Sequence, residues 1–96
     1  MKFYFHEEAE AEFNQAIEYY EGCRAGLGLE FAGEVYATVA RVVEFPRAWS
    51  PISKHTRQCL VNRFPFGVIY QLKAGWIRII AVADLRRRPG YWRGRK

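Results

Sequence analysis

The spacing of hydrophobic residues changes along this chain from a helical period to a period of two, and that change constrains the fold most strongly. From Glu7, apolar residues recur every three to four positions as far as the Ala25–Gly26 pair, which predicts an amphipathic helix ended by that glycine. A second helical stretch runs from about Gly28 to Phe45 and stops at Pro46. Because the link between them is short, we expect an antiparallel helical hairpin.

A period of two follows a loop at Arg47–Thr56, which has no regular spacing. Alternating apolar residues there, and a short aromatic run at the start of the chain, predict four strands at Met1–His6, Gln58–Arg63, Phe66–Lys73 and Trp76–Leu85. Ala74–Gly75 fits a tight hairpin between the last two. The order β-α-α-β-β-β predicts an α+β fold, with the helical hairpin on one face of a four-stranded antiparallel sheet. The length allows one domain over residues 1–96.

The same spacing predicts which side chains face the core. On the first helix the apolar stripe comprises Ala9, Phe13, Ala16, Ile17, Tyr20 and Cys23. The second helix has two adjoining stripes, one of Phe31, Val35, Val39 and Val42 and one of Leu29, Ala32, Tyr36 and Val43. In the strands we expect one covered face with Phe66, Val68, Tyr70, Leu72, Ile77, Ile79, Ala81 and Ala83. The opposite face of the last strand then holds Trp76, Arg78, Ile80, Val82 and Asp84, and is the candidate working face.

Charge is divided unevenly along the chain. Residues 1–48 carry four lysines and arginines against nine glutamates, whereas residues 49–96 carry eleven against a single aspartate, Asp84. The basic residues concentrate in a C-terminal tail at residues 86–96, where Tyr91 and Trp92 interrupt them. Basic and aromatic side chains in one segment suit a polyanion with flat bases or an acidic protein partner. We expect the tail to fold back through a turn at Pro89–Gly90, holding Arg86, Arg87 and Arg88 near Arg78, and to be dispensable for folding beyond Leu85.

Several classes of protein are disfavoured. No stretch approaches the roughly 20 apolar residues that span a bilayer, and the start of the chain lacks a signal-peptide pattern, so we expect a cytoplasmic protein with no membrane partner. Cys23 and Cys59 are too few and too far apart for a metal site, and we expect both in the core. We expect no metal or cofactor.

Candidate functional residues are mostly cationic. For a binding surface the candidates are Arg78, Arg86, Arg87, Arg88, Tyr91, Trp92 and Arg93. For metal-independent RNA cleavage, which needs an acid, a base and cations for the phosphate, they are Lys54, His55, Arg86, Arg88 and Tyr91. His6 is interpreted as a helix cap. Asp84 is interpreted as an ion-pair partner of Arg86 that stays ionised, and so as a poor base.

The order of elements and several segments together resemble the RelE/ParE superfamily of toxins from type II toxin–antitoxin systems. The resemblance covers nearly the whole chain and rests on Glu8–Ala9, Tyr19–Tyr20, Gly26–Gly28, Phe31, Pro46, Trp49, Arg63–Tyr70 and Ile80–Trp92. It implies a growth-inhibiting toxin of the kind that stabilises plasmids, neutralised by a cognate antitoxin with an acidic, amphipathic segment. It also implies that the last strand lies between the first and third strands.

The resemblance leaves two modes of action open. The ParE-like branch inhibits DNA gyrase and has no established catalytic set, whereas the RelE-like branch cuts mRNA on the ribosome. The RNA-cleaving branch usually has a basic residue where this chain has Gly67, and often a further helix after the position of Trp92. Both departures favour the ParE-like mode, a protein-binding inhibitor rather than an enzyme. Asp84 stands where the family commonly has histidine. A third alternative is a non-toxic basic module of the same fold that binds nucleic acid or protein.

Overall fold

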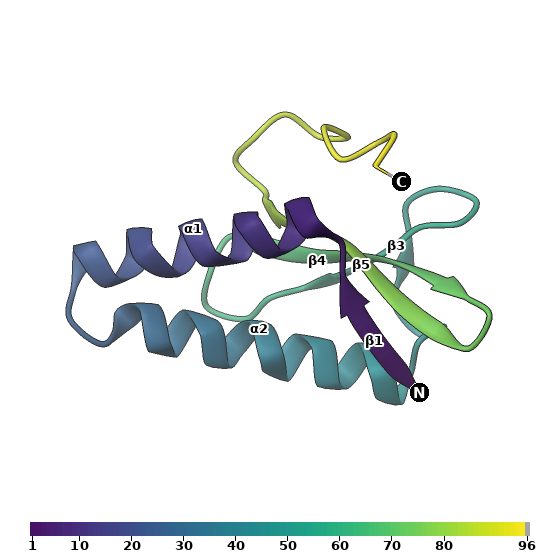
Figure 1. Ribbon diagram of the computed structural model, residues 1–96, viewed down its shortest axis with the longest axis horizontal. Coiled ribbons are helices and arrows are strands. Elements are labelled where there is room, and N and C mark those ends of the chain that lie inside the picture. Colours follow the sequence, from purple (N-terminus) through teal and green to yellow (C-terminus); the bar gives the residue numbers. More distant parts are fainter. Residues whose placement is uncertain (96) are drawn as a thin grey trace.

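Two antiparallel helices cover one face of a five-stranded sheet in the computed structural model, which describes residues 1–95 (Figure 1). Lys96, the last residue of the expected tail, lies outside the described residues. The elements are β1 (Lys2–Phe5), α1 (Glu7–Cys23), α2 (Leu27–Glu44), β2 (Ser50–Pro51), β3 (Arg57–Leu60), β4 (Phe66–Lys73) and β5 (Trp76–Asp84). The expected α+β fold with a helical hairpin on one sheet face is therefore confirmed. No helix within residues 1–95 is long and apolar enough to cross a membrane.

The sheet order is β1-β5-β4-β3-β2, so the last strand lies between β1 and β4 as the resemblance implied. The expectation of a wholly antiparallel sheet of four strands is wrong in two respects. β1 is parallel to β5. Parallel neighbours need a long crossover connection, and the two helices and further strands between β1 and β5 provide one. Ser50–Pro51, expected within a loop, forms the short fifth strand against β3.

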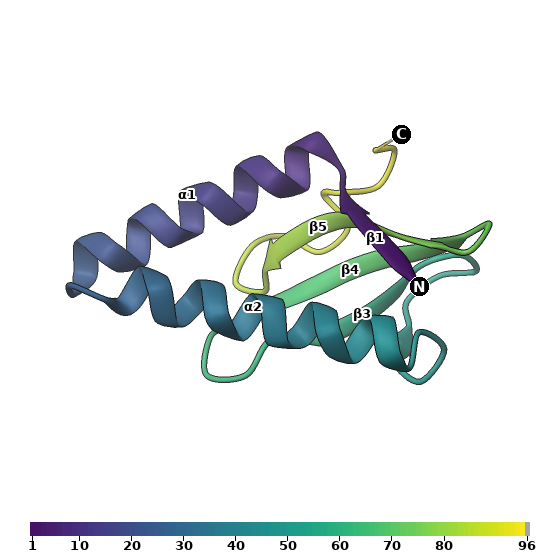
Figure 2. The same ribbon diagram turned by 60° about the horizontal axis from the view of Figure 1, so that its bottom comes forward.

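The helical hairpin depends on contacts in the link between α1 and α2 (Figure 2). The carboxylate of Glu21 accepts hydrogen bonds from the backbone N–H groups of Gly26 (2.8 Å) and Gly28 (3.0 Å), which satisfies donors at the start of α2. Gly26 has φ +88°, a conformation that glycine adopts at little cost. A Cβ atom on Gly28 would lie 2.6 Å from the carbonyl oxygen of Ile17, so the two helices approach too closely there for a side chain.

The main core lies between the helices and the sheet. It contains Phe13, Phe31, Val35, Val39 and other residues of the predicted stripes, all buried. The predicted burial of Cys59 is confirmed, but Cys23 is exposed because α1 has passed beyond the sheet where it ends. The second predicted stripe of α2 is also partly wrong, since the side chains of Leu29 and Tyr36 are exposed, although one edge of the Tyr36 ring meets Phe13 of α1.

A β-bulge in β5 reverses the expected orientation of its second half. Ile79 pairs with Tyr70 but Ala81 pairs with Ile69, so Ile80 is an extra residue that opposes no partner. Residues before the bulge alternate as predicted, with Ile77 and Ile79 facing the helices. Beyond it the faces exchange, so Val82 joins the main core. A second cluster forms on the other face, comprising Ile69, Ile80, Ala81, Ala83 and Trp92.

Candidate functional site

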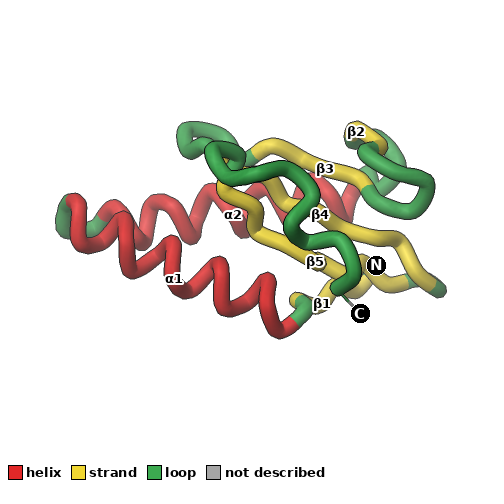
Figure 3. Tube along the Cα trace, turned by 90° about the horizontal axis from the view of Figure 1, so that it is seen from above, coloured by secondary structure: helices red, strands yellow, loops and turns green. Residues whose placement is uncertain are grey.

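The C-terminal tail, defined here as residues 86–95, folds back over the sheet face opposite the helices (Figure 3). Gly90, with φ +82°, follows Pro89 in the reversal that the sequence predicted. Trp92 packs into the second cluster with 9% of its surface exposed, and Tyr91 packs beside it. The prediction that both aromatic residues pack back on the domain is confirmed. The expectation that the core ends at Leu85 is wrong, because Trp92 is part of a core.

A charge pair holds the end of this tail to α1. Both outer nitrogens of Arg95 donate to the carboxylate of Glu12, at 2.9 and 2.8 Å, and one also donates to the carbonyl oxygen of Ile80 at 2.8 Å. Glu12 accepts a further bond from the backbone N–H of Val82 at 3.2 Å. The two side chains are only 11% and 14% exposed. The hydrogen bonds from Arg95 to Glu12 raise the pKa of Arg95.

A second pair lies where the tail leaves β5. The guanidinium of Arg86 donates two hydrogen bonds to the Asp84 carboxylate, both at 2.9 Å, and the backbone N–H of Arg86 donates a third at 3.0 Å. The side-chain bonds from Arg86 hold the pKa of Asp84 below its usual value. The interpretation of Asp84 as an ionised partner that orients the tail is confirmed.

A pocket of about 330 Å³ lies between α1 and the start of the tail. Its floor is apolar, with Ala16, Phe66 and Val82, and its rim is polar. The rim residues come from two segments far apart in the sequence: Glu12, Gln15 and Tyr19 from α1, and Asp84, Arg86, Arg87 and Tyr91 from the end of β5 and the tail.

Tyr91 and Arg87 form the tail side of this pocket. The guanidinium carbon of Arg87 lies 4.1 Å from the centre of the Tyr91 ring, a cation–π contact. The Tyr91 hydroxyl is buried without a hydrogen-bond partner among residues 1–95. Burial, followed by the nearby charge of Glu12, raises the pKa of Tyr91 to about 12, although Glu12 is not placed to accept a hydrogen bond from the phenol. Tyr91 therefore stays protonated at neutral pH.

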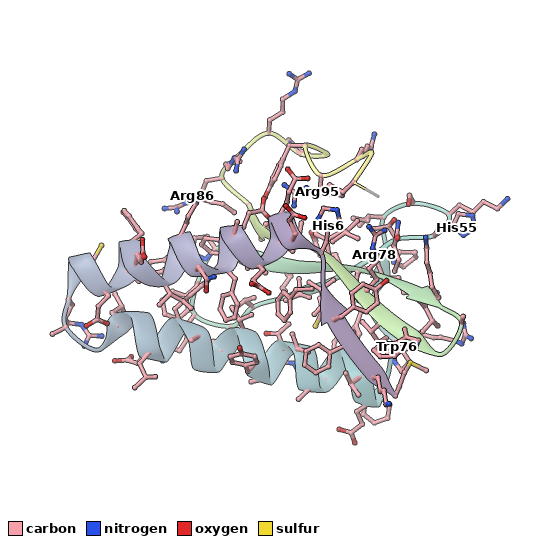
Figure 4. All side chains as sticks on the ribbon, in the orientation of Figure 1. His6, His55, Trp76, Arg78, Arg86 and Arg95 are labelled. Carbon is pink, nitrogen blue, oxygen red and sulfur yellow. The ribbon has the colours of Figure 1, made fainter. Side chains whose placement is uncertain are left out.

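The pocket brings together three of the predicted site residues, namely Arg86, Arg87 and Tyr91. It does not include Lys54 and His55, which are exposed in the loop before β3 and line a different hollow. Figure 4 shows His55 well apart from Arg86, on the other side of Arg95 and Arg78 in that view. The set proposed for RNA cleavage is therefore not assembled in this structure.

The other predicted residues have varied positions. Arg88 and Arg93 are exposed, Trp92 is a core residue, and Arg78 is buried on the sheet face away from the pocket. The expectation that Arg86, Arg87 and Arg88 lie near Arg78 is wrong, since the tail residue that shares a cleft with Arg78 is Arg95.

Sequence reasoning missed the contribution of α1 to the site. Glu12 and Gln15 lie outside the apolar stripe predicted for that helix, and Arg95 does not stand out among the basic residues of the tail. One signal was available, because an acidic first half and a basic second half favour contacts between them. Gly67 is buried under the side chain of Gln58, and a Cβ atom there would lie 3.2 Å from the Gln58 amide oxygen. A basic residue at that position would have to displace Gln58.

The chemistry available in the pocket is that of anion binding. Its two carboxylates, Glu12 and Asp84, each accept hydrogen bonds from an arginine, and those from Arg86 hold the pKa of Asp84 below its usual value. Arg87, which lies against the Tyr91 ring, remains to meet a ligand. Within residues 1–95, no group of three or more histidine, cysteine, aspartate or glutamate side chains is placed to hold a metal ion.

Comparison with known proteins places the fold. The sequence matches no protein-family model, and no curated protein is similar enough to match. A chain of the solved structure described as "Chromosomal ParDE TA system from P. aeruginosa" superposes with a TM-score of 0.78. The alignment covers 88% of this chain and 96% of that chain. The chain has the RelE/ParE fold. At 15% sequence identity, this likeness shows the fold alone.

Proposed function

We propose that this RelE/ParE-fold chain is the toxin of a type II toxin–antitoxin system and inhibits growth in the bacterial cytoplasm. The similarity to a chain of a ParDE toxin–antitoxin structure supports this role. The partner that neutralises it is a cognate antitoxin with an acidic, amphipathic segment, whose charge complements the eleven lysines and arginines in residues 49–96.

The mode of action is ParE-like inhibition of DNA gyrase through a protein contact. The observation that carries this choice is that both carboxylates of the tail pocket are already paired with arginines, while His55 lines a separate hollow at the loop before β3. The pocket thus offers cations for a protein carboxylate and no general base for a 2′-hydroxyl. The contact surface comprises Arg86, Arg87 and Tyr91 at the pocket, with Arg88 and Arg93 exposed along the tail.

RelE-like cleavage of mRNA is the second candidate. Arg86, Arg87 and Tyr91 gather at one pocket, and a phenol that stays protonated is able to give a proton to a leaving oxygen. This mode requires a base that the ribosome or the RNA itself would supply. A non-toxic binding module of the same fold is the third alternative.

Induced expression in bacteria separates these candidates. A gyrase inhibitor produces DNA breaks, filamentous cells and a DNA-damage response while bulk mRNA stays intact, and the purified chain inhibits supercoiling by gyrase. A ribonuclease produces codon-phased mRNA cuts before any DNA damage. If a folded, well-expressed chain caused no growth arrest, the non-toxic binding module would be the remaining candidate.

The site is tested with a matched pair of variants in the same assays. Arg87→Gln removes the pocket cation that forms no ion pair within residues 1–95, and Arg47→Gln removes an exposed charge from the loop after α2. We expect the first to relieve growth arrest and the second to leave it unchanged, with both variants folded. Equal toxicity of the two variants would contradict a role for the pocket.

A further inference from the structure

A cleft on the open sheet face, separate from the tail pocket, contains a buried arginine without a counter-ion. Arg78, in the middle of β5, is only 8% exposed, yet none of the ion pairs within residues 1–95 involves it. Its guanidinium donates one long hydrogen bond, 3.4 Å from Nη1 to the side-chain oxygen of Gln71 on the neighbouring strand.

A guanidinium group carries five N–H donors in a planar fork, so most of the donors of Arg78 are left for another acceptor. Burying a charge is costly unless it is paired, and buried charges in proteins are normally paired for that reason. An oxyanion that accepts two parallel hydrogen bonds is the partner that this geometry suits best. The unpaired state of Arg78 therefore indicates a ligand rather than a structural ion pair.

The surroundings of Arg78 form an open cleft of about 600 Å³, a size typical of small-molecule sites. Lys73 of β4 lines the same cleft and adds a second cation. At one end the cleft is bordered by His6 and Arg95, which Figure 4 shows beside Arg78. Glu7 also lines the cleft but forms no ion pair with Arg78. Arg95 is committed to Glu12, so Arg78 and Lys73 are the cations available to a ligand.

Two exposed aromatic rings lie next to these cations. Tyr4, which pairs with Arg78 across β1 and β5, is 43% exposed, and Trp76 is 41% exposed. The ring centres are 5.7 Å apart, and Tyr4 lines both the arginine cleft and a shallow hollow against Trp76. Aromatic side chains beside cations offer a flat ring a surface for stacking while its phosphate is bound.

We propose that this cleft binds a small phosphorylated ligand of mononucleotide size, with its phosphate on Arg78 and Lys73 and its flat ring against Tyr4 and Trp76. A free small molecule fits better than a long strand, because the tail at Arg95 and the start of α1 at His6 border the cleft at one end. The site is independent of the tail pocket and of the function proposed for it. It gives the chain a surface through which a small phosphorylated molecule is sensed.

Calorimetric titration of the full chain with 5′-mononucleotides, inorganic phosphate and a 5′-phosphorylated oligonucleotide tests this inference. We expect a mononucleotide to bind more tightly than phosphate, and Arg78→Met to weaken both by about tenfold or more, the scale of lost charge-assisted hydrogen bonds. Tyr4→Ala should weaken the mononucleotide and spare phosphate. Arg47→Gln, which removes the same charge elsewhere, should change neither.

Folding is monitored by the thermal midpoint, which Arg78→Met should leave unchanged or raise, because it replaces an unpaired buried charge with an apolar side chain. If that variant fails to fold, NMR chemical-shift mapping of the native chain with a mononucleotide still tests the proposal. The shifts that change must then belong to residues around Tyr4 and Arg78 rather than around Arg87 and Tyr91. No binding at millimolar ligand, equal losses in Arg78→Met and Arg47→Gln, or binding confined to the oligonucleotide or to an acidic peptide would overturn the proposal.

Discussion

Arg95 and Glu12, which are 83 positions apart in the chain, together bond to backbone groups of β5 that no strand pairs. β1 ends opposite Ile79, so the next groups along that edge of β5 have no strand beside them. Arg95 donates to the carbonyl of Ile80 and Glu12 accepts from the N–H of Val82. The pair thus replaces the hydrogen bonds of a missing strand and protects an open sheet edge.

Removing one member of this pair should be costly. Glu12→Gln or Arg95→Met leaves a mostly buried charge uncompensated, and we expect a loss of about 3–5 kcal/mol in the free energy of unfolding. The double variant should lose less than the sum of the two, because the pair acts as a unit. Urea unfolding of the native chain, the two single variants and the double variant measures the coupling energy between Glu12 and Arg95. Glu8→Gln is the control, since Glu8 is exposed and lies 3.6 Å from Arg95. If Glu8→Gln lost as much unfolding free energy as Glu12→Gln, the buried Glu12–Arg95 pair would have no special role.

The tail should contribute to folding as well as to function. Trp92→Ala removes a large buried side chain from the second cluster, and we expect it to cost about 3–5 kcal/mol, similar to the roughly 2–5 kcal/mol of Ile79→Ala in the main core. Deletion of everything after Leu85 should therefore destabilise the chain. Circular dichroism melts provide the measurement, and Arg88→Ala, at an exposed tail position, should melt like the native chain.

The two glycines within α2 should respond to alanine in opposite directions. Gly28→Ala places a Cβ atom 2.6 Å from a backbone carbonyl of α1, so the hairpin must open and stability should fall. Gly33 is exposed, with no atom within 4 Å of the position of a Cβ, and Gly33→Ala should stabilise the helix by about 0.5–1 kcal/mol. Thermal melts of the two variants distinguish them; a gain in both would mean that the helices are not in close contact at Gly28.

Tyr91→Phe should not destabilise the protein at neutral pH, because the hydroxyl that it removes is buried without a hydrogen-bond partner within the described chain. The pKa of Tyr91 is about 12 in the folded chain and about 10 in the unfolded chain. Raising the pH from about 10 to about 12 therefore ionises the unfolded state first, and the stability that Tyr91 contributes is lost. The advantage of the phenylalanine variant should grow across that interval, as followed by urea unfolding. If the difference in unfolding free energy between the two proteins stayed constant over this pH interval, the Tyr91 hydroxyl would not be shielded from water in the folded chain.

The helices and the longer strands could be predicted from the sequence, because within each of them the apolar residues recur at a regular helical or strand spacing. The helical hairpin, the turn at Ala74–Gly75 and the buried face of Val35 and Val39 all depend on residues close together in the chain. The bulge at Ile80 could not be predicted, because an apolar run on both sides of the strand hides the extra residue. The direction of β1 depends on a path through two helices, which no local pattern records.

The candidate site was predictable only on the tail side. Arg86, Arg87 and Tyr91 stand out as a basic and aromatic cluster, and Asp84 as a lone acid among arginines. Their partners on α1 look like ordinary solvent-facing residues, because Glu12 belongs to an acidic helix face. Arg78 was singled out for its charge, but its burial and its lack of an ion-pair partner among residues 1–95 depend on how β1, β4 and the tail meet.

The bulge at Ile80 also has a consequence for variation in sequence. Ahead of it, the side chains of β5 that point toward the helices stand at odd-numbered positions, and beyond it at even-numbered ones. A deletion of Ile80 would remove the bulge and restore a regular ladder in which Ile79 and Val82 still face the helices, but the second cluster would lose the Ile80 side chain that packs with Trp92. The extra residue therefore serves the face that the tail covers rather than the face that the helices cover. A relative that lacks this extra residue could keep the same helix-facing side chains and would differ in the apolar surface that it offers to its tail.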